Sequence, residues 1–152
     1  MQLSPHFSLA EMTKSATALR RGVPNAPGEA EIAALRRLCV AVLEPVRAHF
    51  GRPVFVNSGY RSPRINWLVG GQATSQHCRG EAADIELPGV ANGAVAAWIR
   101  DHLAFDQLIL EAYTPGRPDS GWVHVSFRAD RCRRMCLTWP GATVGYLSGL
   151  RL

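Results

Sequence analysis

Residues 74–87 read TSQHCRGEAADIEL, a polar loop that runs directly into an alternation of apolar and polar residues. Because side chains point to opposite faces of a strand in turn, EAADIEL (81–87) predicts a strand with Ala83 and Ile85 on a core face and Asp84 on the other. His77 lies in the loop that leads into this strand. A histidine and an aspartate therefore stand seven positions apart where the loop becomes the strand.

The same alternation recurs downstream in two stretches joined by a Pro/Gly-rich turn: FDQLILEAY (105–113), the turn TPGRPDSG (114–121) and WVHVSF (122–127). Both stretches predict strands. In the first, Glu111 shares a face with Gln107, opposite the apolar leucines. In the second, His124 lies opposite two valines. If the three strands pair in one sheet, Asp84, Glu111 and His124 converge on the same open face.

The rest of the chain predicts helices followed by strands joined by short turns, which is typical of an α+β domain. Apolar residues recur at helical spacing from Ile32 to Val46, and Pro45 should kink or end that helix. Ser62 and Pro63 favour the start of another helix. The further predictions are a strand within 53–61, a loop over 70–80, a helix over 91–103 and an edge strand over 133–139. At 152 residues, the chain has the length of one domain, residues 1–152.

The composition excludes a disordered chain, since 47% of the residues are hydrophobic and 19% are charged. No stretch approaches 18 uninterrupted apolar residues, so we expect no membrane insertion. The formal charge of +5 favours a polyanionic partner such as nucleic acid, an acidic membrane surface or a cell wall, or else reflects a solvated basic surface. Four arginines near the C-terminus carry part of this charge: Arg128, Arg131, Arg133 and Arg134. A solvated face is the favoured interpretation for them, and binding to an anionic wall or outer-membrane surface is the alternative.

The N-terminal residues 1–21 show no basic region followed by an apolar stretch, so we expect synthesis in the cytoplasm without a signal peptide. No oxidising compartment is then implied. The spacing of the last two cysteines is weak support for a zinc site. We therefore expect four free thiols, at Cys39, Cys78, Cys132 and Cys136.

Two histidines and one carboxylate, His77, His124 and Asp84, are typical ligands of a catalytic zinc ion, which keeps a fourth position for water. A further carboxylate nearby would then serve as general base. A single histidine on a strand is also common as an ordinary hydrogen-bonded residue. The spacing alone therefore leaves a purely structural role open.

Several motifs resemble those of the M15 zinc peptidases. SQHCRGEAADI (75–85) fits the family signature SxHxxGxAxD, and WVHVS (122–126) resembles its second signature, WxH. Further stretches are similar to the subgroup found in phage endolysins and bacterial peptidoglycan peptidases: HFSLAEM, GVPNAP, VLEPVR, SGYRSPRIN, VGG and FDQLILE. The resemblance covers roughly residues 4–137. It implies the α+β domain of hedgehog proteins and D-Ala-D-Ala peptidases, an antiparallel sheet with helices on one face and one zinc ion on the open face, held by His77, Asp84 and His124.

The resemblance also implies roles for other side chains. Arg61 would bind the substrate carbonyl or carboxylate and stabilise the developing oxyanion, or else hold its turn. Ser75 and Gln76 would contact substrate or a ligand, or else cap the loop, and Trp122 would line the cleft or cap the core. Small residues, among them Gly80, would let the chain pass close to the metal.

The general base is the least determined residue. Many M15 enzymes place an acid three residues before the third ligand, but here that position is Gly121. Glu111 is our first choice, because it shares a face with the other site residues. Asp119, in the turn before the last strand, is the second candidate, and Asp106 is the third.

Together with these residues, the resemblance implies a monomeric zinc peptidase that cleaves peptidoglycan beside a D-residue, as members of the family do. We expect a phage or prophage endolysin that acts on the wall after release. The bond is left open among L-Ala–D-Glu, D-Ala–meso-diaminopimelate and D-Ala–D-Ala. One alternative is a housekeeping or virion-associated wall peptidase. Another is a catalytically inactive, hedgehog-like zinc domain that binds a partner, which the absent acid at Gly121 favours. A nucleic-acid-binding module rests on charge alone, so we expect no nucleic acid partner.

Overall fold

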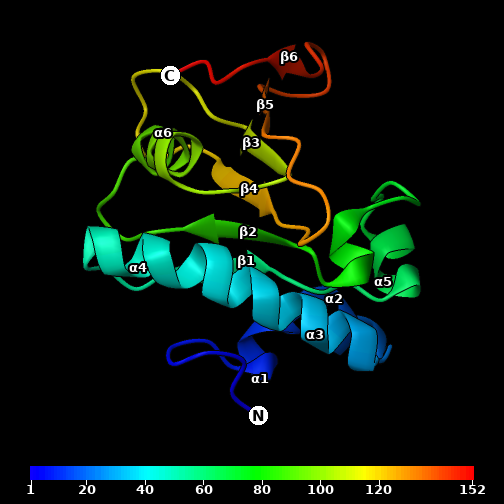
Figure 1. The fold of residues 1–152 in the computed structure, drawn as a ribbon. Helices are drawn as coiled ribbons and strands as arrows, with labels where there is room; N and C mark the ends of the chain where they lie inside the picture. The colour runs from blue at the N-terminus through cyan, green and yellow to red at the C-terminus, as the bar shows by residue number, and fades with distance from the viewer.

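A six-stranded sheet lies at the centre of the computed structural model, which describes residues 1–152 (Figure 1). Its strand order is β1-β2-β4-β3-β5-β6. The strands are β1 (Phe55–Ser58), β2 (Ala82–Glu86), β3 (Gln107–Glu111), β4 (Trp122–Ser126), β5 (Met135–Trp139) and β6 (Leu147–Ser148). The helices are α1 (Leu9–Met12), α2 (Ala16–Arg21), α3 (Glu29–Leu38), η1 (Cys39–Leu43), α4 (Glu44–Phe50), α5 (Pro63–Leu68), η2 (Gln76–Arg79) and α6 (Asn92–His102). The α+β class predicted from the sequence is confirmed.

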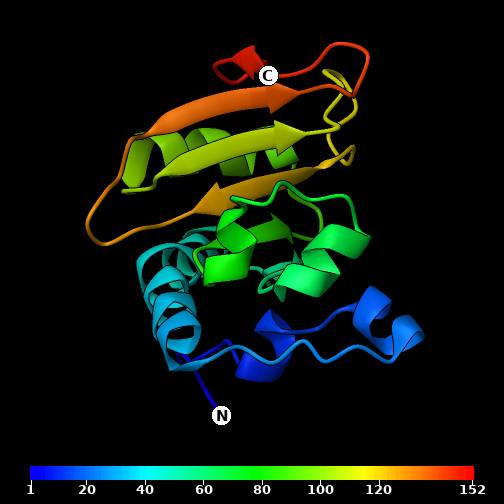
Figure 2. The same ribbon diagram turned by 90° about the vertical axis from the view of Figure 1, so that its right-hand side faces the viewer.

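The sheet differs from the expected antiparallel one at β5, which runs parallel to β3. The eight residues 127–134 pass across the beginning of β3 and start β5 at the end of the sheet where β4 stops (Figure 2). Since β5 therefore runs against β4, and β3 also runs against β4, β3 and β5 share a direction. Residues 133–139 were also expected to form an edge strand, but β6 pairs beyond β5 and makes β5 internal.

The helix predicted from Ile32 to Val46 extends through α3, η1 and α4 as one rod (Figure 1). Pro45 does not end it. The five residues before α4 form a π-helical turn, in which the Glu44 N–H reaches the Cys39 carbonyl. A proline lacks an N–H and crowds the preceding turn, and the wider π turn accommodates it.

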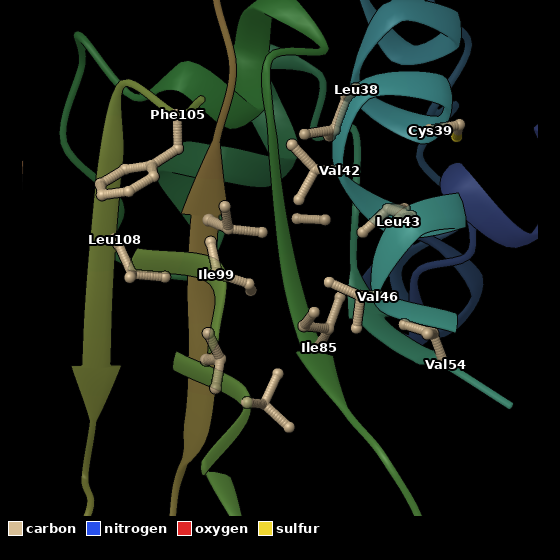
Figure 3. Packing of buried hydrophobic residues seen from close by; sticks show 14 of the residues in the cluster. Leu38, Cys39, Val42, Leu43, Val46, Val54, Ile85, Ile99, Phe105 and Leu108 are labelled. Carbon is tan, nitrogen blue, oxygen red and sulfur yellow. The ribbon is translucent and has the colours of Figure 1, made fainter. Parts of the chain in front are cut away.

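The core fills the space between this rod, α6 and one face of the sheet. In Figure 3, Leu38, Val42 and Val46 point from the rod towards Ile85 of β2, whereas Cys39 points to the other side, towards α1. The predicted apolar face of the rod is buried, apart from the half-buried Ile32. The core thus takes the apolar parity of the strands and leaves the polar parity on the opposite face.

The opposite face carries η2 and α5 in front of β2, with α6 behind the sheet (Figure 2). Residues 70–80 were predicted as a loop, and η2 is a single 3-10 turn inside it. Ser75 accepts a hydrogen bond at its start, and Gly80 ends it in the left-handed conformation.

None of the helices is both long and apolar enough to cross a membrane. All four cysteines are free thiols, as predicted.

Candidate metal centre and substrate cleft

Strand register places two of the candidate ligands side by side. Asp84 of β2 pairs with His124 of β4, which pairs in turn with Ile109 of β3. We call these three aligned positions the ligand row, although only Asp84 and His124 are candidate ligands. His77 joins the row from η2, above β2. All three candidate metal ligands are buried, and their ligand atoms lie within 4.8 Å of one another.

The spacing of these atoms fits a tetrahedral metal site. His77 Nε2 lies 3.3 Å from His124 Nδ1 and 3.4 Å from Asp84 Oδ1, and the latter two atoms are 2.9 Å apart. In a tetrahedron with metal–ligand bonds of about 2.0–2.1 Å, neighbouring ligand atoms lie about 3.3–3.4 Å apart. Two of the three edges match this value, and the third is shortened by a hydrogen bond between His124 and Asp84.

The protonation of His77 and Asp84 suits metal binding. Burial lowers the pKa of His77, so its imidazole is neutral, the form that binds metals. Burial opposes ionisation of Asp84, but the hydrogen bond from His124 Nδ1 holds the pKa of this carboxyl well below its usual range. The Nδ1 of His77 lies 2.7 Å from the Gly59 carbonyl oxygen. Because that oxygen only accepts, Nδ1 carries the proton and Nε2 presents its lone pair to the site.

Gly80 is small for a different reason from the one expected. The resemblance implied that it lets the chain approach the metal. In the structure its φ is +67°, and a side chain there would run into the backbone carbonyl of Glu31 at the start of α3. Gly80 therefore allows α3 to pack against the end of η2, and this contact helps to hold the turn that carries His77.

Arg61 lies beside the ligand row, with its Nη2 3.6 Å from Asp84 Oδ2. Its backbone N–H donates to the His77 carbonyl at 3.2 Å, which ties its turn to η2. The side-chain Nε is buried and has no partner within the protein. An unpaired buried donor is costly, so this group is available to a ligand.

Sequence reasoning missed the residue that holds the Arg61 turn, which is Asn25 of the GVPNAP stretch. The Asn25 amide donates to the Thr13 carbonyl at 2.8 Å and to the Tyr60 carbonyl at 3.0 Å. It also accepts from the Ser62 N–H at 2.7 Å. The only signal in the sequence was an asparagine within a Pro/Gly-rich loop, and that signal names no partner.

A cleft of about 1260 Å³ lies over the ligand row, and Glu111 lines it. Glu111 is the neighbour of Trp122 in the β3–β4 pairing and of Trp139 in the β3–β5 pairing. Burial raises the pKa of Glu111, and the nearby Asp84 carboxylate also raises it while His124 opposes the shift. A carboxyl group in this state accepts a proton more readily than an exposed one.

The two rival acids lie elsewhere. Asp119 is exposed and lines a separate, smaller pocket beside Pro118 and Phe55. Asp106 is fully buried, and its carboxylate already accepts hydrogen bonds from Arg133 and Gln76. Of the three candidates, the structure brings only Glu111 into the cleft.

Backbone geometry explains why the residue three positions before His124 is a glycine. Gly121 has a φ of +66°, and a side chain there would collide with the Glu111 carbonyl oxygen and the Ala112 backbone. An acid therefore cannot occupy position 121 in this fold of the turn. The same crowding brings Glu111 close to the beginning of β4.

The remaining predicted site residues also line the cleft; Ser75 and Gln76 already have hydrogen-bond partners there, and Trp122 does not. Ser75 accepts from the His77 N–H at 3.3 Å as the cap of η2. The Gln76 amide donates to Asp106 at 3.0 Å and to Glu81 at 3.4 Å. The indole N–H of Trp122 is buried and has no partner within the protein, so it can donate to a ligand.

The arginines near the C-terminus lie in two places. Arg128, Arg131 and Arg133 line the cleft. Arg134 does not, because its guanidinium donates to the Leu103 and Arg100 carbonyls. Arg131, Arg133 and Arg134 are exposed, as a solvated surface requires, and three of the four arginines also border the cleft.

Two imidazoles and one carboxylate on the floor of an open cleft define a candidate metal centre of the kind found in hydrolases. The family model described as Peptidase M15 matches residues 5–126, and the chain belongs to this family. Membership implies a metallopeptidase, and the His77, Asp84 and His124 group could hold its metal ion. No curated protein matches the sequence.

Proposed function

We propose that the protein is a zinc-dependent peptidase that cleaves peptidoglycan beside a D-residue. The observation that carries this proposal is the near-tetrahedral spacing of three buried ligand atoms on the floor of an open cleft. Zinc bound there would act as a Lewis acid and lower the pKa of a bound water towards neutrality. His77, Asp84 and His124 would hold one zinc ion per chain.

Glu111 is the proposed general base. It lies two residues along β3 from Ile109 of the ligand row, on the same face of the sheet. Its raised pKa favours proton uptake from the attacking water, and that proton can then pass to the leaving amine. Arg61 is proposed to stabilise the oxyanion, since its Nε is unpaired and its guanidinium lies beside Asp84.

The charge of the cleft supports an anionic peptide as substrate. Two carboxylates line it, Asp84 and Glu111, against six basic side chains: Lys14, Arg61, Arg79, Arg128, Arg131 and Arg133. Peptidoglycan stem peptides carry free carboxylates, and an open cleft admits a branched polymer. Trp122 is proposed to contact this peptide through its unpaired indole N–H, whereas the Ser75 hydroxyl already caps η2.

We further propose a role in host-cell lysis as the endolysin of a phage or prophage, acting as a monomer on the wall. The similarity of SGYRSPRIN and the other quoted motifs to phage endolysins supports this role. Expression in a Gram-negative host should leave cells intact until the inner membrane is permeabilised, after which the culture should lyse. Equal lysis by Glu111→Gln protein would contradict this role.

The test of the peptidase is incubation of the pure protein with purified sacculi. We expect release of muropeptides that stops with a chelator and returns with added zinc. Mass spectrometry of the fragments would identify the bond. An inactive zinc domain would bind zinc but release nothing, and this outcome would replace the peptidase with a binding module.

A further inference from the structure

On the Gln107 side of the sheet, the cleft is lined by three arginines that follow the family-matched segment 5–126. Along β3, Glu111 lies two residues to one side of the ligand row and Gln107 two residues to the other. The connection 127–134 crosses the sheet at the Gln107 end, on the left in Figure 2, and the turn 112–121 lies at the opposite end. We call the side chains of Arg128, Arg131 and Arg133 at this place the arginine end.

A buried carboxylate organises the arginine end. Asp106 has no exposed surface, and both of its oxygens accept from Arg133, at 2.8 Å from Nε and 2.8 Å from Nη2. It also accepts from the Arg133 backbone N–H at 3.2 Å and from Gln76 at 3.0 Å. The guanidinium of Arg133 is therefore fixed where the connection passes over the cleft.

Arg131 is the least satisfied cation of this end. Its Nε lies 3.8 Å from Asp106, beyond hydrogen-bond distance, and its guanidinium donates no hydrogen bond within the protein. About half of its side chain is exposed. Arg128, in contrast, is paired with the exposed Asp130.

The charges at this place do not cancel. Four guanidinium groups, those of Arg79, Arg128, Arg131 and Arg133, face three carboxylates, those of Glu81, Asp106 and Asp130. One positive charge is left over, and the geometry places it on Arg131. Because a planar guanidinium matches a carboxylate with two parallel hydrogen bonds, this charge suits a carboxylate ligand.

We propose that the arginine end binds a free carboxylate of the substrate peptide through Arg131, with Arg133 and Arg128 beside it. This inference rests on the proposed peptidase function and names the feature of the substrate that it selects. Two strand residues span about 7 Å, so the carboxylate would lie on the order of two residues from the bond over the ligand row. The enzyme would then distinguish stem peptides with free carboxylates from those in which they are amidated.

The test measures binding, so it does not depend on turnover. The zinc-loaded Glu111→Gln protein is titrated calorimetrically with a synthetic stem tetrapeptide, and with the same tetrapeptide whose carboxylates are carboxamides. We expect the amidated peptide to bind about tenfold more weakly, the effect of hydrogen bonds to one charged group. Adding Arg131→Gln should remove this preference. The control Arg37→Gln, on the exposed surface of α3 outside the cleft, should keep it while losing the same charge.

Two results would overturn the inference: equal binding of both peptides by the Glu111→Gln protein, or an unchanged preference after Arg131→Gln. The sacculus assay separates this result from the fate of the proposed function. If Arg131→Gln loses the preference for the free-carboxylate peptide and Arg37→Gln keeps it, the arginine end is supported even when the native protein releases no muropeptides. Release of muropeptides without any carboxylate preference retains the peptidase and rejects the arginine end.

Discussion

The ligand row and the arginine end lie in one cleft but are held in place by different means. Asp84 and His124 are opposite each other because β2 and β4 pair in one register. The arginine end rests on side-chain contacts between Asp106 and residues of the connection 127–134. Backbone pairing of the strands therefore holds the ligand row in position, whereas the buried Asp106 carboxylate holds the arginine end.

This difference has a consequence for substitution. Ladder hydrogen bonds join backbone groups, so removing a side chain of the row leaves its neighbours in position. Removing Asp106 leaves the Arg133 guanidinium without its partner and frees the connection above the cleft. We therefore expect substitutions of the ligands in the row to abolish hydrolysis with little change of structure. Substitution of Asp106 should instead lower the stability of the fold and leave the metal site in place.

The largest expected effect is loss of the metal. His77→Ala and His124→Ala each remove one of three ligands, so we expect zinc content well below one per chain and no detectable hydrolysis. The native protein should also lose thermal stability when a chelator removes its zinc, because metal binding is linked to folding. Metal analysis and thermal unfolding measure the two effects. His102→Ala changes an exposed histidine outside the cleft and should keep full zinc; undiminished zinc in both ligand variants would refute the site.

The next effect concerns turnover alone. Glu111→Gln keeps the shape of the side chain and removes its capacity to accept a proton, so kcat should fall at least roughly 10²-fold, the lower end of general-base catalysis. Zinc content and thermal stability should stay near those of the native protein. Asp119→Asn is the matched control, since Asp119 lies outside the cleft. An inactive Asp119→Asn together with an active Glu111→Gln would reverse the assignment.

Sequence reasoning succeeded where the side-chain period of a strand decides the geometry. The parity of β2, β3 and β4 was sufficient to bring Asp84, Glu111 and His124 to one face, because strand pairing preserves the period of two. The apolar parity likewise identified the core. His77 became a candidate because its loop leads into β2, and the motif resemblance supported it as a ligand.

The missed features depend on contacts between segments far apart in sequence. Asp106 meets Arg133 across 27 residues, and Asn25 meets Tyr60 across 35. No local pattern encodes such a partner. The parallel direction of β5 follows from the path of a short connection, and the glycine at 121 follows from crowding by the Glu111 backbone. Both are visible only once the strands are assembled.

A smaller effect should follow from Asp106→Asn, and it acts on stability. The hydrogen bonds from Arg133, against the opposing effect of burial, lower the pKa of Asp106 to about 2. A carboxyl whose folded pKa is depressed stabilises the fold fully above its ordinary pKa near 4. That stabilisation is lost as the pH falls from about 4 towards 2. The variant should therefore be less stable than the native protein by about 2 kcal/mol at pH 7.

Urea unfolding at pH 7 and at pH 3 measures this difference, which should shrink at the lower pH. Zinc content at pH 7 should stay near one per chain, because strand pairing holds Asp84 and His124, and an amide oxygen at position 106 can still accept from Gln76 beside His77. A variant that loses zinc as strongly as His77→Ala would break the distinction between the two regions. A difference in stability that stays constant between the two pH values would reject the ion pair as its cause.

The smallest expected effect concerns Ser75, because His77 is the one ligand that no strand holds. Its position depends on η2, whose first turn is capped by the Ser75 hydroxyl. Removing a cap of this kind costs about 1 kcal/mol, so Ser75→Ala should weaken zinc binding several-fold and leave the KM for peptide nearly unchanged. Ser75→Thr keeps a capping hydroxyl and should restore the affinity for zinc, which competition with a chromophoric chelator would measure. If Ser75→Ala instead raises KM and leaves zinc affinity unchanged, the hydroxyl acts on the substrate. The position of His77 would then not depend on the Ser75 side chain, just as strand pairing alone fixes the positions of Asp84 and His124.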